Sequence, residues 1–434
     1  MIARYSTEAM SRIWSEQART ETWLRVELAI CEAAEKHGKI PAGTTEAIRS
    51  KAKFDLARMA ELEKETRHDL MAFVRNVSEN VGEPGRYFHY GVTSYDVIDT
   101  SLALMMRESL EHVIESLGKL RKVVRRLMLA HKDTPMIGRT HGIHAEPITF
   151  GFKAASWLTE LRRSSKRLRQ CLKEISVGKV SGPVGVRGVL GPEVEEEACR
   201  ILGLRPDPIS TQIVSRDRHA TVVNALAVLG ATLERIATEL RNLQRTEILE
   251  VQEEFAAGQT GSSAMPHKRN PWHSETVCGL ARVLRSNAMA MMESIATWHE
   301  RDLTNSSVER IILPDSFHLI DFMLNRVRTI LERLEVRADN MKRNLKLMGD
   351  LVYSEHLMIA LIGKGLSREA AYKVAQRNAA RAWEGEDFRK CVESDPEVQA
   401  HLTPDELEQV FSLEHHLRHV GPAIQRVADA RSLC

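Results

Sequence analysis

The sequence LAVLGATLERIATELRNL at residues 226–243 decides the fold class of this chain. Its leucines and its isoleucine recur in steps of three and four residues, at positions 226, 229, 233, 236, 240 and 243. These steps keep the apolar side chains on one side of a helix, and a seven-residue repeat favours nearly parallel packing of long helices. The stretch therefore predicts one long helix of a helical bundle.

Four more segments have a similar apolar periodicity and predict further long helices. Each would run about 25 to 35 residues, well beyond the usual mean of about 11–12. A bundle of such helices exposes much apolar side surface, and self-association is the natural way to bury it. A cofactor-binding surface is the alternative for these stripes, but core packing explains their spacing fully. The apolar positions are 110, 113, 117, 120, 124 and 127; 152, 155, 158, 161, 168 and 172; 277, 280, 284, 288, 291, 295 and 298; and 317, 320, 324, 327, 331 and 334.

The chain changes character on both sides of this predicted bundle. Shorter helices are expected over residues 1–100 and again from about residue 340 onward, because Gly and Pro interrupt the pattern there. Strand signals are weak, and the irregular stretches are expected at 132–146, 176–216 and 255–273. We therefore expect an all-α fold with three domains: an N-terminal helical domain (1–93), a central long-helix bundle (94–341) and a C-terminal helical domain (342–434). The interruptions are Gly38, Pro41, Gly82, Pro84 and Gly91 in the first part, and Gly363, Pro396, Pro404 and Pro422 in the last.

The overall composition excludes several classes of protein. The 434 residues are 43% hydrophobic and 28% charged, and the formal net charge of +2 is no broad basic excess for nucleic acid. No stretch approaches the roughly 18 apolar residues of a membrane span, and the N-terminus has no leader-like apolar run. The six cysteines have no C-x-x-C spacing, which indicates neither a zinc site nor a disulfide framework. A reduced, cytoplasmic compartment fits best, with no nucleic-acid or membrane partner.

The stretch GQTGSSAMPHKRNP at residues 258–271 is the most informative candidate for chemistry. Its glycines, serines and prolines cannot continue a helix, so it predicts a loop between two long helices. A flexible connection with a solvated Lys268 is the simpler interpretation of any part of it. The long, ordered string as a whole favours a functional loop.

Two further stretches combine polar groups with the start of a predicted helix. GRTHGIHAEP at residues 138–147 contains His141 and His144, and either one alone would more often be structural than catalytic. HYGVTSYDVID at residues 89–99 places Thr93 and Ser94 where either could cap a long helix and leave backbone N–H groups facing a carboxylate or phosphate. Capping alone is the alternative for these hydroxyls.

Together, the three stretches resemble the three active-site regions of the fumarase/aspartase superfamily. Within it, the closest likeness is to the adenylosuccinate lyase family, and the likeness covers essentially the entire chain. The Arg-rich strings are the strongest part of the likeness to this family, because other superfamily members share the serine loop but need no nucleotide phosphate site. The supporting strings are RYS (4–6), TRHD (66–69), STQIVSRDRH (210–219), LQRTE (243–247), WHERD (298–302), SSVER (306–310) and GLSREAAY (365–372).

The resemblance implies a cofactor-independent lyase that eliminates fumarate from adenylosuccinate, giving AMP, and from the succinylated aminoimidazole carboxamide ribotide (SAICAR), giving AICAR. It implies a homotetramer whose helical core shares active sites between subunits, and it demands no metal. By the same likeness Ser262 is the base, Lys268 and Asn270 bind the developing dianion, His141 is the acid, and His68 lies at the phosphate and assists His141. The remaining substrate contacts implied are Arg4, Tyr5, Arg67, Asp69, Thr93, Ser94, Gln212, Ser263, Arg301, Ser306 and Arg310.

Some alternatives stay open on the sequence alone. Each arginine taken separately would more often form a helix-surface ion pair. A carboxymuconate-cycloisomerase relative has a very similar serine loop, argininosuccinate lyase and fumarase act on substrates without phosphate, and a crystallin-like structural protein could use the same scaffold. The chain also departs from the family pattern: Tyr95 replaces a common serine, and the loop SGPVGVRG (181–188) holds Pro183, Val186 and Arg187 at unusual places.

Overall fold

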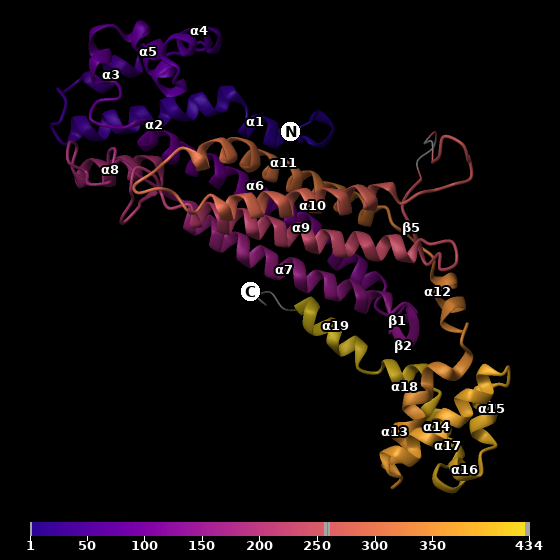
Figure 1. Ribbon diagram of the computed structural model, residues 1–434. Coiled ribbons are helices and arrows are strands. Elements are labelled where there is room, and N and C mark those ends of the chain that lie inside the picture. The colour runs from indigo at the N-terminus through magenta and orange to yellow at the C-terminus, as the bar shows by residue number, and fades with distance from the viewer. Residues whose placement is uncertain (1, 256–257, 259–260, 430–434) are drawn as a thin grey trace. The chain divides into compact units, whose positions relative to one another are not determined.

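The computed structural model describes residues 2–255, 258 and 261–429, and it confirms the all-α fold class (Figure 1). The N-terminal part consists of short and medium helices, as expected. Helix α2 ends just before Gly38 and helix α5 just before Gly82, two of the predicted interruptions. The elements are η1 (Ala3–Tyr5), α1 (Glu8–Ile13), α2 (Glu16–Lys36), α3 (Thr44–Arg49), α4 (Leu56–Thr66), α5 (Asp69–Val81) and η2 (Glu83–Tyr87).

Five long helices follow, at the places that the apolar periodicity predicted (Figure 1). The six apolar positions of residues 226–243 are all at most 2% exposed, so the stripe faces a core. Three positions assigned to the other stripes are wrong: Phe152, Ile295 and Trp298 are 41%, 44% and 79% exposed. Ile295 and Trp298 lie beyond the end of α10, where helical periodicity no longer applies. The helices are α6 (Ser94–Ala130), α7 (Phe150–Ile175), α9 (Asp217–Leu243), α10 (Trp272–Glu293) and α11 (Thr304–Glu332).

Two stretches expected to be irregular contain regular structure instead. Residues 132–146 hold most of an antiparallel hairpin of β1 (Pro135–Thr140) and β2 (Ile143–Thr149), and the following helix begins directly after it, at Phe150. Residues 176–216 contain α8 (Pro192–Leu202), whose first position is a proline, the residue best suited to a helix start. The same stretch also contains the two-residue strands β3 (Val177–Gly178) and β4 (Arg205–Pro206), which pair with each other. A further short pair, β5 (Val251–Gln252) with β6 (Glu335–Val336), lies elsewhere in the chain.

The C-terminal part returns to short helices, as predicted. Pro396 and Pro404, expected as stops, are the first residues of new helices and are preceded by the capping side chains of Asp395 and Thr403. The elements are α12 (Ala338–Leu345), η3 (Gly349–Tyr353), α13 (Ser354–Gly363), α14 (Arg368–Trp383), α15 (Phe388–Glu393), α16 (Pro396–His401), α17 (Pro404–Val410), α18 (Leu413–Leu417) and α19 (Val420–Asp429).

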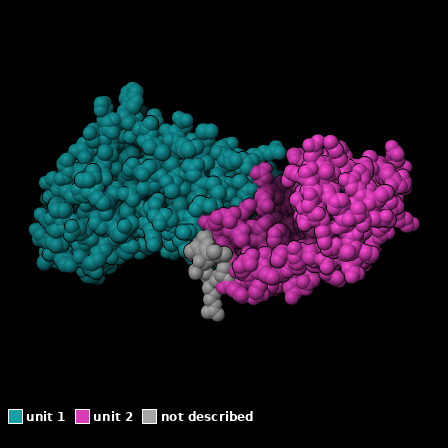
Figure 2. Space-filling model, turned by 90° about the horizontal axis from the view of Figure 1, so that it is seen from below, with its two compact units in different colours: residues 1–118, 164–233, 277–326 teal, residues 119–163, 234–276, 327–434 magenta. Residues whose placement is uncertain are grey.

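The chain divides into two compact units, coloured separately in Figure 2. Unit 1 comprises residues 1–118, 164–233 and 277–326, and unit 2 comprises residues 119–163, 234–276 and 327–434. Each of the five long helices therefore contributes one part to each unit. The expected division into three domains at 93/94 and 341/342 stays a prediction.

Each unit has a hydrophobic core of its own. In unit 1, α2, α5 and the first turns of α6 pack with α8 around Trp23, Phe73 and Leu104. In the same unit α9, α10 and α11 lie side by side, and a Cβ on Gly230 would come within 2.8 Å of Leu284. In unit 2, α13, α14 and α17 pack around Leu357. Gly230 of α9 thus lies in close contact with the side chain of Leu284 of α10.

Helix α9 is long and apolar enough to cross a membrane, the one such helix in the described part of the chain. This corrects the expectation that no stretch comes near that composition. However, 67% of its most apolar window is buried inside the protein, as in the core helix of a bundle.

The cysteines are internal. The five that the structure describes are buried, and Cys31, Cys171, Cys199 and Cys391 are free thiols. Burial raises the pKa of Cys171 to about 11, which makes its thiol unreactive at neutral pH. Cys434 lies outside the described residues.

Candidate active site

The N-terminus of α6 is anchored by a buried carboxylate rather than only by the hydroxyls expected there. Asp96 Oδ2 accepts the backbone N–H of Thr93 at 2.8 Å, and Asp96 forms a fully buried ion pair with Lys179. Asp96 Oδ1 also accepts the backbone N–H of Ser181 at 3.0 Å. The helix end that carries Thr93 and Ser94 is therefore tied to the loop that begins at Ser181.

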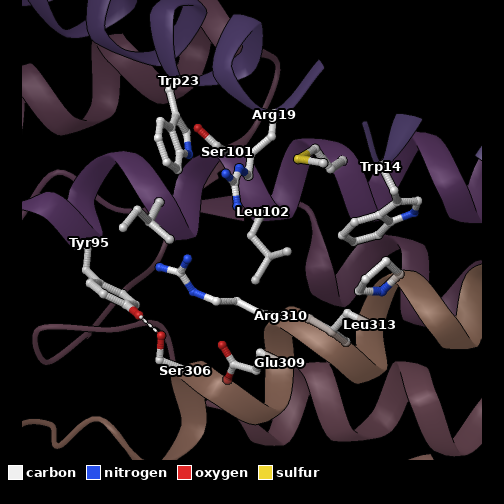
Figure 3. A pocket seen from close by; sticks show the side chains of 13 residues that line it. Trp14, Arg19, Trp23, Tyr95, Ser101, Leu102, Ser306, Glu309, Arg310 and Leu313 are labelled. Carbon is white, nitrogen blue, oxygen red and sulfur yellow. Dashed lines mark hydrogen bonds between the residues drawn. The ribbon is translucent and has the colours of Figure 1, made fainter. Parts of the chain in front are cut away.

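A pocket of unit 1 collects residues from the α1–α2 junction, α2, α6 and α11 (Figure 3). Tyr95, Ser306 and Arg310 border it, and Tyr95 Oη lies 3.1 Å from Ser306 Oγ. Two of these residues, Ser306 and Arg310, were implied as substrate contacts by the family resemblance. The SSVER segment therefore lies next to the start of α6.

Arg301 is held in this site from two sides. Its guanidinium carbon lies 3.5 Å from the centre of the Tyr95 ring, and its Nη1 donates to Gln212 Oε1 at 2.9 Å. Gln212 in turn donates from Nε2 to the carbonyl of Pro183 at 3.2 Å. Both departures from the family pattern, Tyr95 and the Pro183 loop, therefore support the same arginine.

The same guanidinium keeps unused hydrogen-bond donors. Nε and Nη2 of Arg301 are buried and have no hydrogen-bond partner among the described residues. Buried N–H groups in proteins are nearly always paired, so two such donors on one cation indicate the place of an anion. Arg301 thus differs from the helix-surface ion pair that was the alternative for each arginine.

The TRHD stretch lies at the junction of α4 and α5 and reaches the same helix α11. Arg67 ends α4 in the left-handed conformation with φ 53°, and His68 Nδ1 accepts the Met71 N–H at 3.4 Å to cap α5. Asp69 accepts from Arg310 Nη2 at 2.6 Å. Burial alone would raise the pKa of Asp69, but the Arg310 cation and its hydrogen bond hold it below its ordinary value. Asp69 is therefore ionised at neutral pH, and its carboxylate holds the Arg310 guanidinium in position.

Arg4 and Tyr5, near the N-terminus, have fewer contacts with this site. Arg4 and Tyr5 lie in η1, and the Tyr5 ring packs edge-on against Phe322 of α11 at 5.3 Å between centroids. Arg4 is exposed. Tyr5 is thus brought to the helix that bears Ser306 and Arg310, whereas no contact recorded for the described residues joins Arg4 to them.

In unit 2, His141 occupies the tip of the β1–β2 hairpin. Thr140 pairs with Ile143, so His141 and Gly142 form a two-residue turn, with φ 54° and 81°. Two positive φ values are the mark of a type I′ turn. The exposed imidazole is thereby presented to the outside of the subunit.

A buried ion pair fixes the base of that hairpin. Arg139 of β1 donates from Nη1 and Nη2 to the two oxygens of Glu250, at 3.0 and 2.7 Å, and Glu250 is fully buried. The same arginine adjoins His144, whose pKa is lowered first by burial and then by this positive charge. His144 is therefore the neutral, structural histidine of the pair, and His141 is the accessible one.

The serine loop has a defined shape over its described residues. A Cβ on Gly261 would lie 2.0 Å from the carbonyl oxygen of Lys268, so only glycine fits there. Asn270 Nδ2 closes the loop by donating to the Gly261 carbonyl at 3.1 Å. Gln259 and Thr260 lie outside the described residues. The loop therefore brings Lys268 and Asn270 next to the segment that begins with Ser262.

Ser262 Oγ sits among backbone donors. It accepts from the N–H groups of Ala264 and Met265 at 3.3 and 3.1 Å. Donors to an oxygen favour its ionised form, which is what a serine base requires. The neighbouring Ser263 and Lys268 are exposed. Among the described residues, no hydrogen bond or ion pair joins His141 to Ser262 or Lys268.

Sequence reasoning missed several lining residues of the pocket in unit 1. Trp14, Arg19 and Trp23 come from α1–α2 and line it together with Glu309 (Figure 3). Arg19 lies over the Trp23 ring at 5.0 Å. The four-residue spacing of Arg19 and Trp23 on α2 was the available signal, but it equally fits a helix facing the core.

Comparison with known proteins agrees with this geometry. A lyase family matches residues 3–285, and a family described as the adenylosuccinate lyase C-terminus matches residues 350–427. The adenylosuccinate lyase of Synechocystis is 48% identical over 98% of this chain and 100% of its own length, and that of Aquifex aeolicus is 48% identical over 98% and 99%. The structure of a fumarate lyase from Mesorhizobium has a TM-score of 0.90 at 27% identity, covering 99% of this chain and 100% of its own. A 3-carboxy-cis,cis-muconate lactonizing enzyme from Pseudomonas putida has a TM-score of 0.88 at 30% identity, covering 98% and 97%.

The all-helical fold and the serine loop, with these similarities, define a lyase of the fumarase/aspartase class. Within that class, the C-terminal match and the full-length identity to adenylosuccinate lyases are decisive. The chain belongs to the adenylosuccinate lyase family.

Proposed function

We propose that this chain cleaves adenylosuccinate to AMP and fumarate, and SAICAR to AICAR and fumarate, without a cofactor. Family membership supports the reaction type. The single observation that carries the choice of a nucleotide is Arg301, just before α11, which has two buried donors without a partner among the described residues and packs on the Tyr95 ring, whose hydroxyl bonds to Ser306. A phosphate monoester fits such forked donors.

The chemistry assigns separate tasks to the residues of the two units. Ser262, as an alkoxide, would remove the proton from the carbon beside a substrate carboxylate. The electron pair then delocalises into that carboxylate, and Lys268 with Asn270 would bind the resulting dianion. As the C–N bond breaks and the C=C bond forms, His141 would give its proton to the departing nitrogen. The two backbone donors at Ser262 Oγ support its role as the base.

The nucleotide end would be recognised by residues of unit 1. Arg4, Tyr5, Arg67, His68 and Asp69 come from the N-terminal part and the α4–α5 junction. The phosphate contacts are assigned to Arg301, Ser306 and Arg310, and the other substrate contacts to Thr93, Ser94 and Gln212, together with Ser263 from the serine loop of unit 2.

A homotetramer with shared active sites is part of the proposal. Several large apolar side chains on α9, α10 and α11 are exposed in the single subunit, which supports burial against further copies. They are Val228 (46%), Val283 (42%), Met289 (60%), Met292 (43%) and Ile311 (69%). Buried, free thiols support the reducing compartment of the cytoplasm.

The direct test is an ultraviolet assay of purified protein on adenylosuccinate and on SAICAR. We expect both to be cleaved, with fumarate released and no water consumed. No turnover of either substrate would end the assignment. Faster turnover of a phosphate-free substrate, such as a carboxymuconate, would favour the alternative suggested by the Pseudomonas putida enzyme's name.

Tyr95 is expected to position Arg301 and Ser306 for the nucleotide. Tyr95→Phe removes only the hydrogen bond to Ser306, so KM should rise about 2- to 12-fold, the equivalent of one hydrogen bond. Tyr95→Leu also removes the ring that supports the Arg301 guanidinium, and KM should rise further, because a desolvated cation–π contact contributes about 2 kcal/mol. Steady-state kinetics on both substrates measure the effect.

In both variants kcat should change much less than KM, because the reacting atoms are assigned to other residues. Tyr372→Phe is the matched control, since that tyrosine is 55% exposed on α14. An unchanged KM in Tyr95→Leu would contradict the positioning role.

A further inference from the structure

A second cluster of ionisable side chains lies in unit 2, outside the proposed active site. Glu146 of β2, His356 of α13 and His416 of α18 each direct one ligand-type atom to a common point, and these atoms lie within 4.8 Å of one another. Glu146 and His356 line one pocket together with Glu355. The three residues are 60 to 270 positions apart in sequence, so the fold alone assembles them.

The tautomer of His416 is determined by its neighbours. Its Nε2 lies 2.9 Å from the carbonyl oxygen of Pro147, and a carbonyl only accepts, so Nε2 carries the hydrogen. The lone pair is therefore on Nδ1, which lies 2.7 Å from His356 Nε2. A histidine whose second nitrogen donates to a backbone carbonyl is the usual arrangement of a metal ligand.

The pocket beside the cluster holds a second carboxyl group, that of Glu355. Glu355 precedes His356 on α13 and lines the same pocket as Glu146. The cations of the same pocket are engaged elsewhere: Lys364 pairs with Glu406, and Arg418 donates to the His415 carbonyl. Two carboxyl groups thus accompany the two imidazoles, which also lie within the electrostatic influence of Arg418.

We propose that Glu146, His356 and His416 bind a divalent transition-metal ion, with Zn²⁺ the best match. Two imidazole nitrogens and a carboxylate oxygen form a common three-ligand zinc set, which water or Glu355 could complete to four. Binding at the usual Zn–N distance of about 2.0–2.1 Å requires the two nitrogens to separate from 2.7 Å to about 3.3 Å.

The proton balance of this step is simple. The ring hydrogen of His356 moves from Nε2 to Nδ1 through solvent. Nε2 is then free as a ligand, and the imidazole loses no proton overall. Any proton shared by Glu146 and Glu355 is released to the solvent when the metal binds. The ion would tie β2, and with it the hairpin that ends at His141, to helices α13 and α18. The inference does not rest on the proposed activity.

The test titrates Zn²⁺ into EDTA-treated, full-length protein by calorimetry, and records visible spectra with Co²⁺. We expect the wild type to bind one more Zn²⁺ than His356→Ala, or to bind it at least about tenfold more tightly, and to give the absorption of four-coordinate Co²⁺. Glu146→Gln, which keeps the side-chain volume, should show the same loss. Far-UV circular dichroism confirms the fold, and where His356→Ala is unfolded the Glu146→Gln result decides.

The matched control is His415→Ala. His415 is an exposed histidine of the same pocket and is not one of the three clustered ligands, so zinc binding should equal that of the wild type. The same zinc stoichiometry and affinity in wild type, His356→Ala and Glu146→Gln would overturn the proposal, as would no zinc binding by the wild type.

Discussion

Replacing Ser262 with Ala is expected to lower kcat for both succinylated nucleotides by about 10²–10⁴, the usual contribution of a general base. The alanine loses the hydrogen bonds from Ala264 and Met265 but keeps the Asn270–Gly261 hydrogen bond that closes the loop. KM should change little, since the phosphate contacts are assigned to α11. The measurement is the steady-state ultraviolet assay at matched enzyme concentration.

Ser394→Ala is the matched control for this prediction. That serine is exposed, and its hydroxyl bonds only to carbonyls of its own helical turn, so its loss should leave kcat unchanged. Circular dichroism and gel filtration establish that the Ser262 variant keeps its fold and assembly. A Ser262→Ala enzyme with full activity would refute the assigned base, and a wild type without activity would favour a structural protein on this scaffold.

Replacing Arg216 with Met is expected to lower the free energy of unfolding by about 3–5 kcal/mol, the usual cost of breaking a buried ion pair. Arg216 is 1% exposed and donates to both oxygens of Asp99 at 2.7 and 2.8 Å. It also donates to Glu309 at 2.7 and 3.1 Å. Its removal leaves two buried carboxylates without a cation. Urea denaturation at fixed protein concentration measures the change, because association also contributes to stability.

Two comparisons give this prediction its specificity. Arg58→Met removes an arginine that pairs with Glu61 and Glu79 at the surface, so the unfolding midpoint should shift far less. Adding Asp99→Asn and Glu309→Gln to Arg216→Met should recover part of the loss, because neutral amides are less costly to bury than unpaired carboxylates. A shift in Arg216→Met no larger than in Arg58→Met would be inconsistent with a buried pair.

Much of the fold follows from local patterns. The positions of all five long helices follow from steps of three and four apolar residues, since helical geometry relates neighbours in the sequence directly to neighbours on one face. The errors have a local cause too. Phe152 fitted its stripe in sequence but is exposed in the first turn of α7, and the hairpin at 135–149 was missed because its strands are short and carry polar residues.

The candidate site was accessible from sequence where a motif is contiguous. The stretches 258–271 and 138–147 were each singled out as units, and the backbone geometry at Gly261 and Gly142 explains their glycines. The residues that support Arg301 and Ser306 could not be predicted in this way. Tyr95 was noted only as a departure from a pattern, and its contacts with Arg301 and Ser306 join residues more than two hundred positions apart.

The sequence by itself determined the helical class, the long-helix stripes and the three chemically marked stretches, because each depends on residues within a few turns of one another. Only the tertiary structure decided what each charged group does. Arg216 is neutralised in a core, Arg310 is positioned by Asp69 and Arg301 keeps free donors, although all three are arginines of a chain with 61 basic residues. The physical reason is that the energy of a charge depends on its burial and on partners brought close by folding, and neither is encoded in local spacing.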